Sequence, residues 1–402
     1  MLQLSFVNFR KDTYILVEGK EDTDRFYIIQ SGHVKIVHQN EIPGTPPEVL
    51  GPGDFIGVIS SMSGHSQIET VVAMSDVVAI SVKRDQYPEL IEKNTPVAMK
   101  IIRTFAHRMR VLNETLMKQT LKNSSTEQPV QIYNVAEYYY NQKQYDIAAF
   151  AYYQFIKLCK TGPQAEKAMK LFAALRKSSK AVYLESNQDL LRVYPKGTMI
   201  MSESQGGADM FIIQDGTVKI SKIVDGTEVT LAILKKGDMF GEMALLENKP
   251  RSASAIATDD CRLMTINKSN FNQMVATQPQ LVSRLTTMLA DRLWSMNRQL
   301  ANSLLGGNPV AKMTDMLALQ VEKNRIELKK GTQYQTTLTV EDIATMCGLK
   351  KQDQMRHIYS FQNSSLIKIN GGKIFIPDCL ELVKQAAFYR KQIAKQQATT
   401  QK

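Results

Sequence analysis

Apolar and polar residues alternate in short runs in two parts of the chain, and glycines or Asp-Gly pairs interrupt these runs. The runs at 34–37 and 218–220 are examples. A period of two predicts half-buried strands, and short strands joined by frequent turns are typical of an antiparallel barrel. The hydrophobicity pattern therefore predicts two compact β-barrels.

A helical period replaces the alternation after each predicted barrel, at residues 97–117 and 280–304. The second of these segments carries a continuous apolar stripe formed by Leu281, Leu285, Met288, Leu289, Leu293, Met296 and Leu300. Such a stripe packs on its own barrel or pairs with the same helix of a second chain. We expect the pairing, and with it a homodimer.

The two predicted barrels are related by an internal repeat. Residues 27–36 return as 211–220, an offset of 184 residues, and Gly53-Asp54 returns as Gly237-Asp238. Self-similarity over this length predicts one domain present twice, at residues 1–125 and 185–305.

Residues 126–184 lie between the copies and are helical in pattern. A set of small and aromatic residues resembles a single tetratricopeptide-type hairpin closed by a proline: Tyr145, Ala148, Tyr152, Phe155 and Pro163. Stacked repeats are needed to build a peptide-binding groove, so we interpret this segment as a helical spacer.

The composition is that of an ordinary soluble protein of several domains, with 402 residues, 43% hydrophobic and 22% charged. The first residues lack the order of a signal peptide and no apolar run reaches the length of a membrane span, which predicts a cytoplasmic protein without a membrane partner. The four cysteines are far apart and form no metal motif. With no nucleophile and base pair and no P-loop, we expect neither a metal nor an enzyme.

The second copy contains the run that carries the chemistry, residues 240–254, with Gly-Glu-x-Ala-Leu at 241–245 and Pro-Arg-Ser-Ala at 250–253. This run resembles the phosphate-binding cassette of cyclic-nucleotide-binding domains. The resemblance implies a ligand with one phosphate charge and one free ribose hydroxyl. Arg251 suits two phosphate oxygens and Glu242 suits the hydroxyl proton. The other expected contacts are Gly241, Met243, Ala244, Ser252 and Ala253.

An alternative is that Glu242 and Arg251 only pair with each other beneath the barrel. The first copy argues against it, because Val58 and Gln67 stand at the corresponding positions while Gly57 and the barrel pattern remain. We therefore expect a ligand in the second copy. The first copy also has Glu69, which would repel a phosphate, and is expected to bind no cyclic nucleotide.

The base of the ligand is less closely defined by the sequence. In the related activator branch, two adjacent hydroxyl residues on the long helix contact adenine, and Met296 and Asn297 match those positions. The Asn297 amide offers a donor and an acceptor to adenine or guanine. Cyclic AMP is preferred as the commoner bacterial ligand, and cyclic GMP remains open.

The C-terminal segment, residues 306–402, is the basic part, with 15 Lys and Arg against 8 Asp and Glu. Thr339 is a good N-cap for a helix that ends at Gly348, a second helix spans 350–363, and 366–376 is typical of a two-stranded wing. This order resembles the winged helix-turn-helix of the catabolite-activator (Crp/Fnr) family.

The resemblance implies that the second helix enters the major groove of double-stranded DNA. Its base contacts would be Lys351, Gln352 and Arg356, with the wing residues Lys368 and Lys373 on the backbone. Gln354 and His357 stand where apolar core residues are expected. A winged helix also serves as a protein-binding module, so this alternative stays open.

Together these patterns predict an α+β multidomain chain: two jelly-roll-type cyclic-nucleotide-binding barrels with flanking helices, a helical spacer and a C-terminal winged helix-turn-helix. The predicted function is a cyclic-nucleotide-responsive transcription regulator. The alternative is a cyclic-nucleotide receptor that signals through protein contacts.

Overall fold

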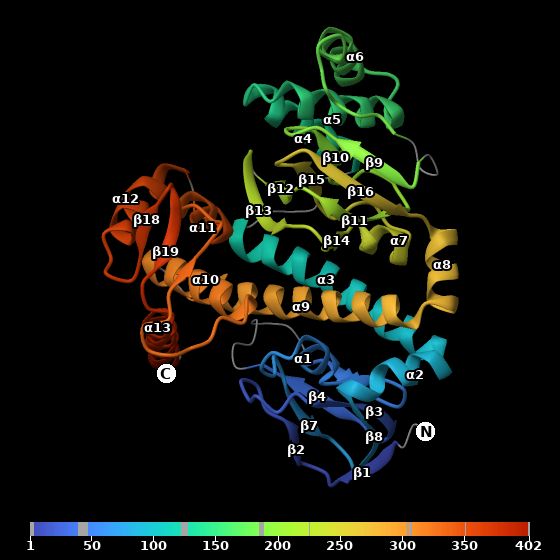
Figure 1. Ribbon diagram of the computed structural model, residues 1–402, viewed down its shortest axis with the longest axis vertical. Coiled ribbons are helices and arrows are strands. Elements are labelled where there is room, and N and C mark those ends of the chain that lie inside the picture. The colour runs from blue at the N-terminus through green and yellow to red at the C-terminus, as the bar shows by residue number, and fades with distance from the viewer. Residues whose placement is uncertain are drawn as a thin grey trace. The chain divides into compact units, whose positions relative to one another are not determined.

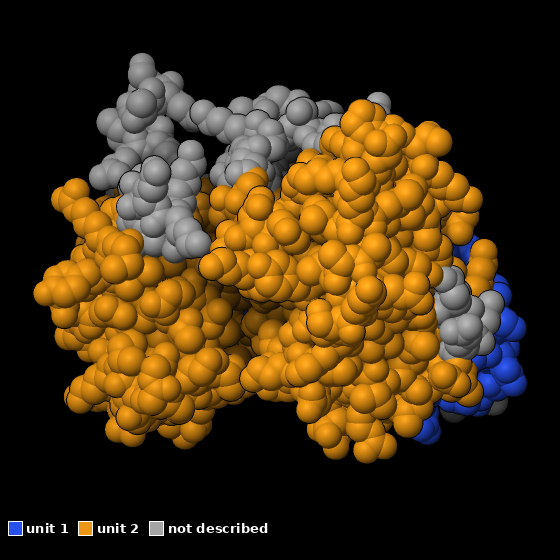
Figure 2. Space-filling view, turned by 90° about the horizontal axis from the view of Figure 1, so that it is seen from above, with its two compact units in different colours: residues 1–112, 269–301 blue, residues 113–268, 302–402 orange. Residues whose placement is uncertain are grey.

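The computed structural model describes residues 4–38, 47–121, 128–184, 189–224, 226–303, 305, 308–349 and 351–400, without the side chains of 117–121, 224, 351–354 and 393–400. The chain divides into two compact units (Figure 2). Unit 1 comprises Met1–Leu112 and Ser269–Ala301, and unit 2 comprises Asn113–Lys268 and Asn302–Lys402.

The barrel of unit 1 consists of two four-stranded antiparallel sheets with the orders β1-β8-β3-β6 and β2-β7-β4-β5. Apolar residues from both sheets, among them Ile29, Val34 and Val71, fill the space between them. Its strands are β1 (Ser5–Phe9), β2 (Tyr14–Leu16), β3 (Arg25–Ser31), β4 (Val34–Val37), β5 (Val49–Leu50), β6 (Phe55–Ile56), β7 (Thr70–Ala73) and β8 (Val77–Lys83).

The barrel of unit 2 has the corresponding orders, β9-β16-β11-β14 and β10-β15-β12-β13. Strand β16 begins 184 residues after β8, at the offset found in the sequence. The prediction of two jelly-roll-like barrels is therefore confirmed. These strands are β9 (Leu191–Tyr194), β10 (Met199–Met201), β11 (Met210–Asp215), β12 (Val218–Val224), β13 (Thr227–Leu234), β14 (Met239–Phe240), β15 (Ser254–Ala257) and β16 (Cys261–Ile266).

The apolar stripe of the second long helix is largely buried inside unit 1. Leu285 and Leu293 are fully buried, and the Trp294 ring stacks on His65 with 4.0 Å between ring centroids. The indole N–H of Trp294 donates to the Ser66 carbonyl at 3.2 Å. Trp294, which adjoins the stripe on the same helix, thus packs against the first barrel. The helices of this unit are α1 (Val58–Ser63), the 3-10 turn η1 (Arg84–Gln86), α2 (Tyr87–Lys93), most of α3 (Thr95–Leu121), most of α8 (Lys268–Thr277) and most of α9 (Pro279–Ser303).

The spacer forms three helices, α4 (Gln128–Asn141), α5 (Tyr145–Leu158) and α6 (Pro163–Arg176), which lie on the barrel of unit 2 (Figure 1). Their apolar core includes Met199, Ile223 and Ile256 of that barrel. Pro163 was expected to close the helical stretch, and this prediction is wrong. Pro163 begins α6, because a proline at the first helical position loses no hydrogen bond.

The C-terminal segment follows the predicted order of elements. Its parts are α10 (Pro309–Lys323), α11 (Val340–Met346), α12 (Lys351–Gln362), α13 (Cys379–Thr400) and the sheet β17-β19-β18 (Tyr334–Gln335, Lys373–Ile376 and Lys368–Asn370). Thr339 caps α11 by accepting from the Asp342 amide at 3.0 Å, in a capping box. Among the described helices, none combines the length and apolar character required to cross a bilayer.

Replacing Trp294 by Ala should destabilise unit 1 by about 3–5 kcal/mol, because a fully packed aromatic side chain is lost. Leu281→Ala on the same helix is the control, since Leu281 is 38% exposed. Denaturant unfolding followed by circular dichroism measures both, as Trp294 is the chain's only tryptophan. Equal effects of the two substitutions would contradict the packing described for α9.

Candidate functional site

A left-handed glycine starts the predicted cassette of the second barrel. Gly241 has φ 80° and precedes the short helix α7 (Glu242–Glu247). Only glycine adopts this conformation without strain, so the chain turns sharply from β14 into α7. Glu242 is the first residue of the helix and is buried, with 1% of its surface exposed.

Arg251 is a buried cation whose guanidinium is only partly satisfied. The residue is 5% exposed, and its Nη1 donates to the Gly241 carbonyl at 2.7 Å. Its Nε is buried and has no hydrogen-bond partner among the described residues. The guanidinium also lies over the Phe211 ring, 5.8 Å from the centroid. An unpaired N–H donor on a buried cation fits an anionic ligand with several oxygens.

Other charged groups that are themselves buried act on the Arg251 guanidinium. Burial has the largest effect and lowers the pKa of Arg251 to about 10, against the opposing attraction of Asp209 first and Glu242 second. Asp209 is itself buried and lies 3.5 Å from the Arg192 guanidinium. Sequence reasoning missed Asp209 and Arg192. Neither residue belongs to the cassette motif. Arg192 lies in β9 and Asp209 directly precedes β11, and only the fold brings these two positions close to Arg251.

Two glycines leave the space that the Arg251 side chain occupies. A Cβ on Gly207 would lie 2.9 Å from Arg251 Nη2, and one on Gly241 would lie 2.8 Å from Nη1. Both distances are shorter than a side-chain contact allows. Gly207 lies in the loop between β10 and β11, so this loop and the cassette enclose the guanidinium from two sides.

The remaining predicted ligand contacts differ in their placement. Met243, Ala244 and Ala253 are buried beside Arg251 in the same barrel, and the Ser252 hydroxyl contacts the Met243 sulfur at 3.5 Å. Asn297 belongs to unit 1, whereas the cassette belongs to unit 2. Its amide donates to the Leu293 carbonyl of its own helix at 2.9 Å.

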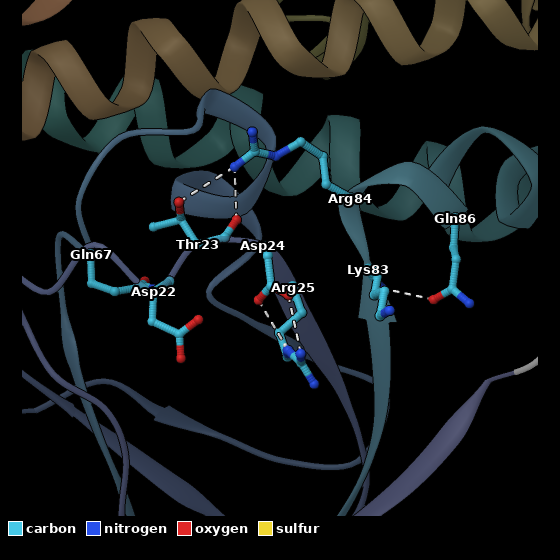
Figure 3. Close-up of polar contacts among 8 residues, drawn as sticks. All are labelled: Asp22, Thr23, Asp24, Arg25, Gln67, Lys83, Arg84 and Gln86. Atoms are coloured by element: carbon cyan, nitrogen blue, oxygen red, sulfur yellow. Dashed lines mark hydrogen bonds and ion pairs between the residues drawn. The ribbon is translucent and has the colours of Figure 1, made fainter.

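The corresponding site of the first barrel is filled by its own side chains. A Cβ on Gly57 would meet Leu16 Cδ1 at 2.8 Å, so an apolar group stands where the second barrel has a guanidinium. Gln67, at the position of Arg251, donates to the Asp22 carbonyl at 2.7 Å (Figure 3). Glu69 forms an ion pair with Arg108 at 3.4 Å, which neutralises the charge that the sequence analysis expected to repel a phosphate.

The same loop of the first barrel is held by a second polar contact. Arg84, which follows β8, donates to the Thr23 carbonyl at 2.8 Å, and Asp24 pairs with Arg25 at 3.1 Å (Figure 3). These contacts are made within the barrel itself. The Oε1 of Gln67 is nevertheless buried without a hydrogen-bond partner among the described residues.

The predicted DNA contacts are only partly within the described side chains. Lys351 and Gln352 fall on α12, but their side chains, like that of Gln354, lie outside the described residues. Arg356, Lys368 and Lys373 are exposed. The buried face of α12 is formed by Ile358 and Phe361, and His357 is half-buried at the border of that face. Among the described residues, no group of three or more His, Cys, Asp or Glu is arranged to hold a metal.

The family model of the cyclic nucleotide-binding domain matches residues 6–94 and 191–278. These two segments are cyclic nucleotide-binding domains. The second domain contains the cassette with Glu242 and Arg251, and the first contains the filled site with Leu16 and Gln67. The domain fold is thus present in both segments, although the charged pair is present in one.

The chain is similar over about half of its length to proteins named as cyclic AMP-dependent regulators or receptors. The chain is 29% identical to the CRP-like cAMP-activated global transcriptional regulator of Mycobacterium tuberculosis over 198 residues, which is 48% of this chain and 86% of the relative. It is 24% identical to the cyclic AMP receptor protein of Thermus thermophilus, over 49% of this chain and 88% of that protein. A solved structure of a CooA mutant from Carboxydothermus hydrogenoformans has a TM-score of 0.42 at 20% identity, covering 50% of this chain and 87% of that one.

Substituting Gly207 by Ala should weaken cyclic AMP binding about tenfold, because the new methyl group would displace the Arg251 guanidinium from its place. Gly206→Ala is the matched control, since a Cβ on Gly206 meets no atom within 4 Å. Calorimetric titration of both variants measures the difference. An unchanged affinity in the Gly207 variant would show that the guanidinium position is not important for the ligand.

Proposed function

We propose that the chain is a cyclic-nucleotide-responsive, DNA-binding transcription regulator with a single working sensor in the second cyclic nucleotide-binding domain. The observation that carries the proposal is the buried Arg251 guanidinium, with an Nε that has no partner among the described residues. Keeping a buried N–H donor of a cation without a partner costs free energy, even with the Asp209 and Glu242 carboxylates nearby. A phosphate ligand offsets that cost.

In the proposed complex, Arg251 binds two oxygens of the cyclic phosphate and Glu242 accepts the ribose 2′-hydroxyl proton. Gly241, Met243, Ala244, Ser252 and Ala253 form the wall around them. The relatives named as cyclic AMP-activated regulators support cyclic AMP as the ligand, with cyclic GMP as the other candidate. Asn297 remains the proposed contact to the base.

We assign double-stranded DNA to the C-terminal segment as its partner. Two helices separated by a glycine turn, followed by a small sheet, are the parts of a winged helix-turn-helix. Arg356 and the wing lysines Lys368 and Lys373 are exposed and available to phosphates or base edges, and Lys351 and Gln352 precede Arg356 on α12. The relatives' names as transcriptional regulators point the same way.

The path from sensor to reader runs through the end of α9. Asn302 donates to the Lys312 carbonyl at 2.9 Å and to Asp315 at 3.0 Å, and the buried Asp315 pairs with Arg390 of α13 at 2.6 Å. These contacts hold Asn302 to α10 and α13, and we propose that a change at the end of α9 on ligand binding is passed to them. We propose that the chain acts as a homodimer and is not an enzyme.

A second candidate function is a cyclic-nucleotide receptor that docks a protein partner. The observation that favours it is an apolar pair on α12, since Met355 is 76% exposed and Tyr359 is 70% exposed one helical turn away. Exposed apolar side chains of this kind are common where proteins associate. Met355 also suits the methyl group of thymine, so the pair is compatible with both functions.

Salt dependence separates the two functions. DNA binding measured by fluorescence anisotropy should weaken steeply between 50 and 200 mM salt, as counterions are released. Replacing both Lys351 and Arg356 by Ala should reduce the slope of log K against log salt by about 2 and leave cyclic nucleotide binding intact.

The control replaces Lys384 and Lys391 of α13 by Ala, which removes the same charge from another helix. Equal losses in the two double variants would mean that only net charge matters. No duplex binding at any salt concentration would overturn the DNA proposal and favour the protein partner.

A further inference from the structure

The loop between β10 and β11 is joined to Arg251 by two backbone hydrogen bonds. The Ser204 amide donates to the Arg251 carbonyl at 2.9 Å, and the Arg251 amide donates to the Gln205 carbonyl at 2.9 Å. Two consecutive loop residues thus face one residue of the cassette segment, as in a β-bulge. The backbone of Arg251 therefore moves only together with this loop.

The first residue of α4, in the spacer, forms a hydrogen bond to this loop. The Gln128 side-chain amide donates to the Ser204 carbonyl at 2.6 Å. Ser204 thus bonds to Arg251 through its N–H and to the spacer through its C=O. One residue links the phosphate-binding position of the second domain to a helix that lies outside the cassette.

A second contact from the same face of α4 reaches the loop by another route. Gln131, one turn after Gln128, donates to the Ile223 carbonyl at 2.9 Å. The Ile223 amide donates to Glu203 at 3.3 Å, and Lys222 lies 3.1 Å from the same carboxylate. Burial raises the pKa of Glu203 against the opposing attraction of Lys222, so the carboxylate is expensive to move away from these partners.

These two glutamines are not needed to keep the spacer on the barrel. The contact between spacer and barrel is an apolar core that includes Ile132, Tyr139 and Phe155 together with barrel residues such as Met199 and Ile256. Because buried apolar side chains stabilise such a contact, we expect the helices to stay on the barrel without the two glutamines. Gln128 instead bonds directly to the loop that is joined to Arg251, and Gln131 reaches the same loop through Ile223 and Glu203.

We propose that Gln128 and Gln131 are positioning residues for Arg251, so that the helical spacer sets the affinity of the second domain for cyclic nucleotide. The inference rests on the ligand role proposed for Arg251. Because coupling is reciprocal, ligand at Arg251 also tightens the loop against α4. The spacer then contributes to ligand binding in addition to connecting the two domains.

The test uses the full chain with both glutamines replaced by Ala, and Tyr139→Phe as the matched control. Tyr139 donates to Glu228 at 2.8 Å in the same interface, but it bonds neither to Ser204 nor to Ile223 in the described contacts. Calorimetric titration should show cyclic AMP binding weakened roughly 5- to 20-fold in the double glutamine variant and less than about 2-fold in Tyr139→Phe.

The thermal midpoint of the ligand-free chain separates positioning from simple loss of stability. Positioning predicts that the glutamine variant loses affinity out of proportion to its fall in midpoint, relative to Tyr139→Phe. Equal proportions in the two variants, or an unchanged affinity in the glutamine variant, would overturn the proposal.

Amide hydrogen exchange supplies a readout that does not depend on the ligand. The Ser204 and Arg251 amides should exchange faster in the glutamine variant and at the wild-type rate in Tyr139→Phe. Unchanged exchange in the glutamine variant overturns the positioning role alone. If the wild-type chain binds neither cyclic AMP nor cyclic GMP, the ligand role of Arg251 fails and the affinity claim fails with it, whatever the exchange shows.

Discussion

The second cyclic nucleotide-binding domain is organised around the buried guanidinium of Arg251, with a second buried arginine, Arg192, in the same group of charges. Burial opposes the charge strongly enough to lower the pKa of Arg251 to about 10. Two glycines make room for the guanidinium, and the carboxylates of Asp209 and Glu242 balance its charge. The Phe211 ring lies beneath it. The Nε remains without a partner among the described residues, and this is the feature that an anion would complete.

The first domain shows what the same barrel does without that charge. Leu16 stands beside Gly57, Gln67 bonds to the backbone of its own domain, and the face near Ser66 receives Trp294 of α9. A site without a buried cation can accept a neighbouring helix, because no cation has to be kept in reach of an anion. The two domains thus share a strand order and differ in what the cassette contacts.

Much of this was predictable from the sequence, and the failures have physical reasons. The period of two and the repeat at 184 residues predicted both barrels. The cassette motif predicted Glu242 and Arg251 as ligand contacts, and the structure buries both side chains. An apolar stripe shows that one helix face is buried but not against what, so the packing of α9 in unit 1 was not predictable. Asp209, Gly207 and the two glutamines of α4 carry no motif, and only the fold brings them to Arg251. In α12, polar residues stand where apolar core residues are expected, so the sequence did not decide between DNA and a protein as its partner.

Calorimetric titration of the full chain with cyclic AMP and cyclic GMP, beside Arg251→Ala, tests the central claim most directly. The account predicts one ligand per chain for the wild type and none for the variant, because the first domain lacks the charged pair. Two ligands per chain would contradict the assignment of a single working sensor, and binding that survives in Arg251→Ala would contradict the role of the buried guanidinium.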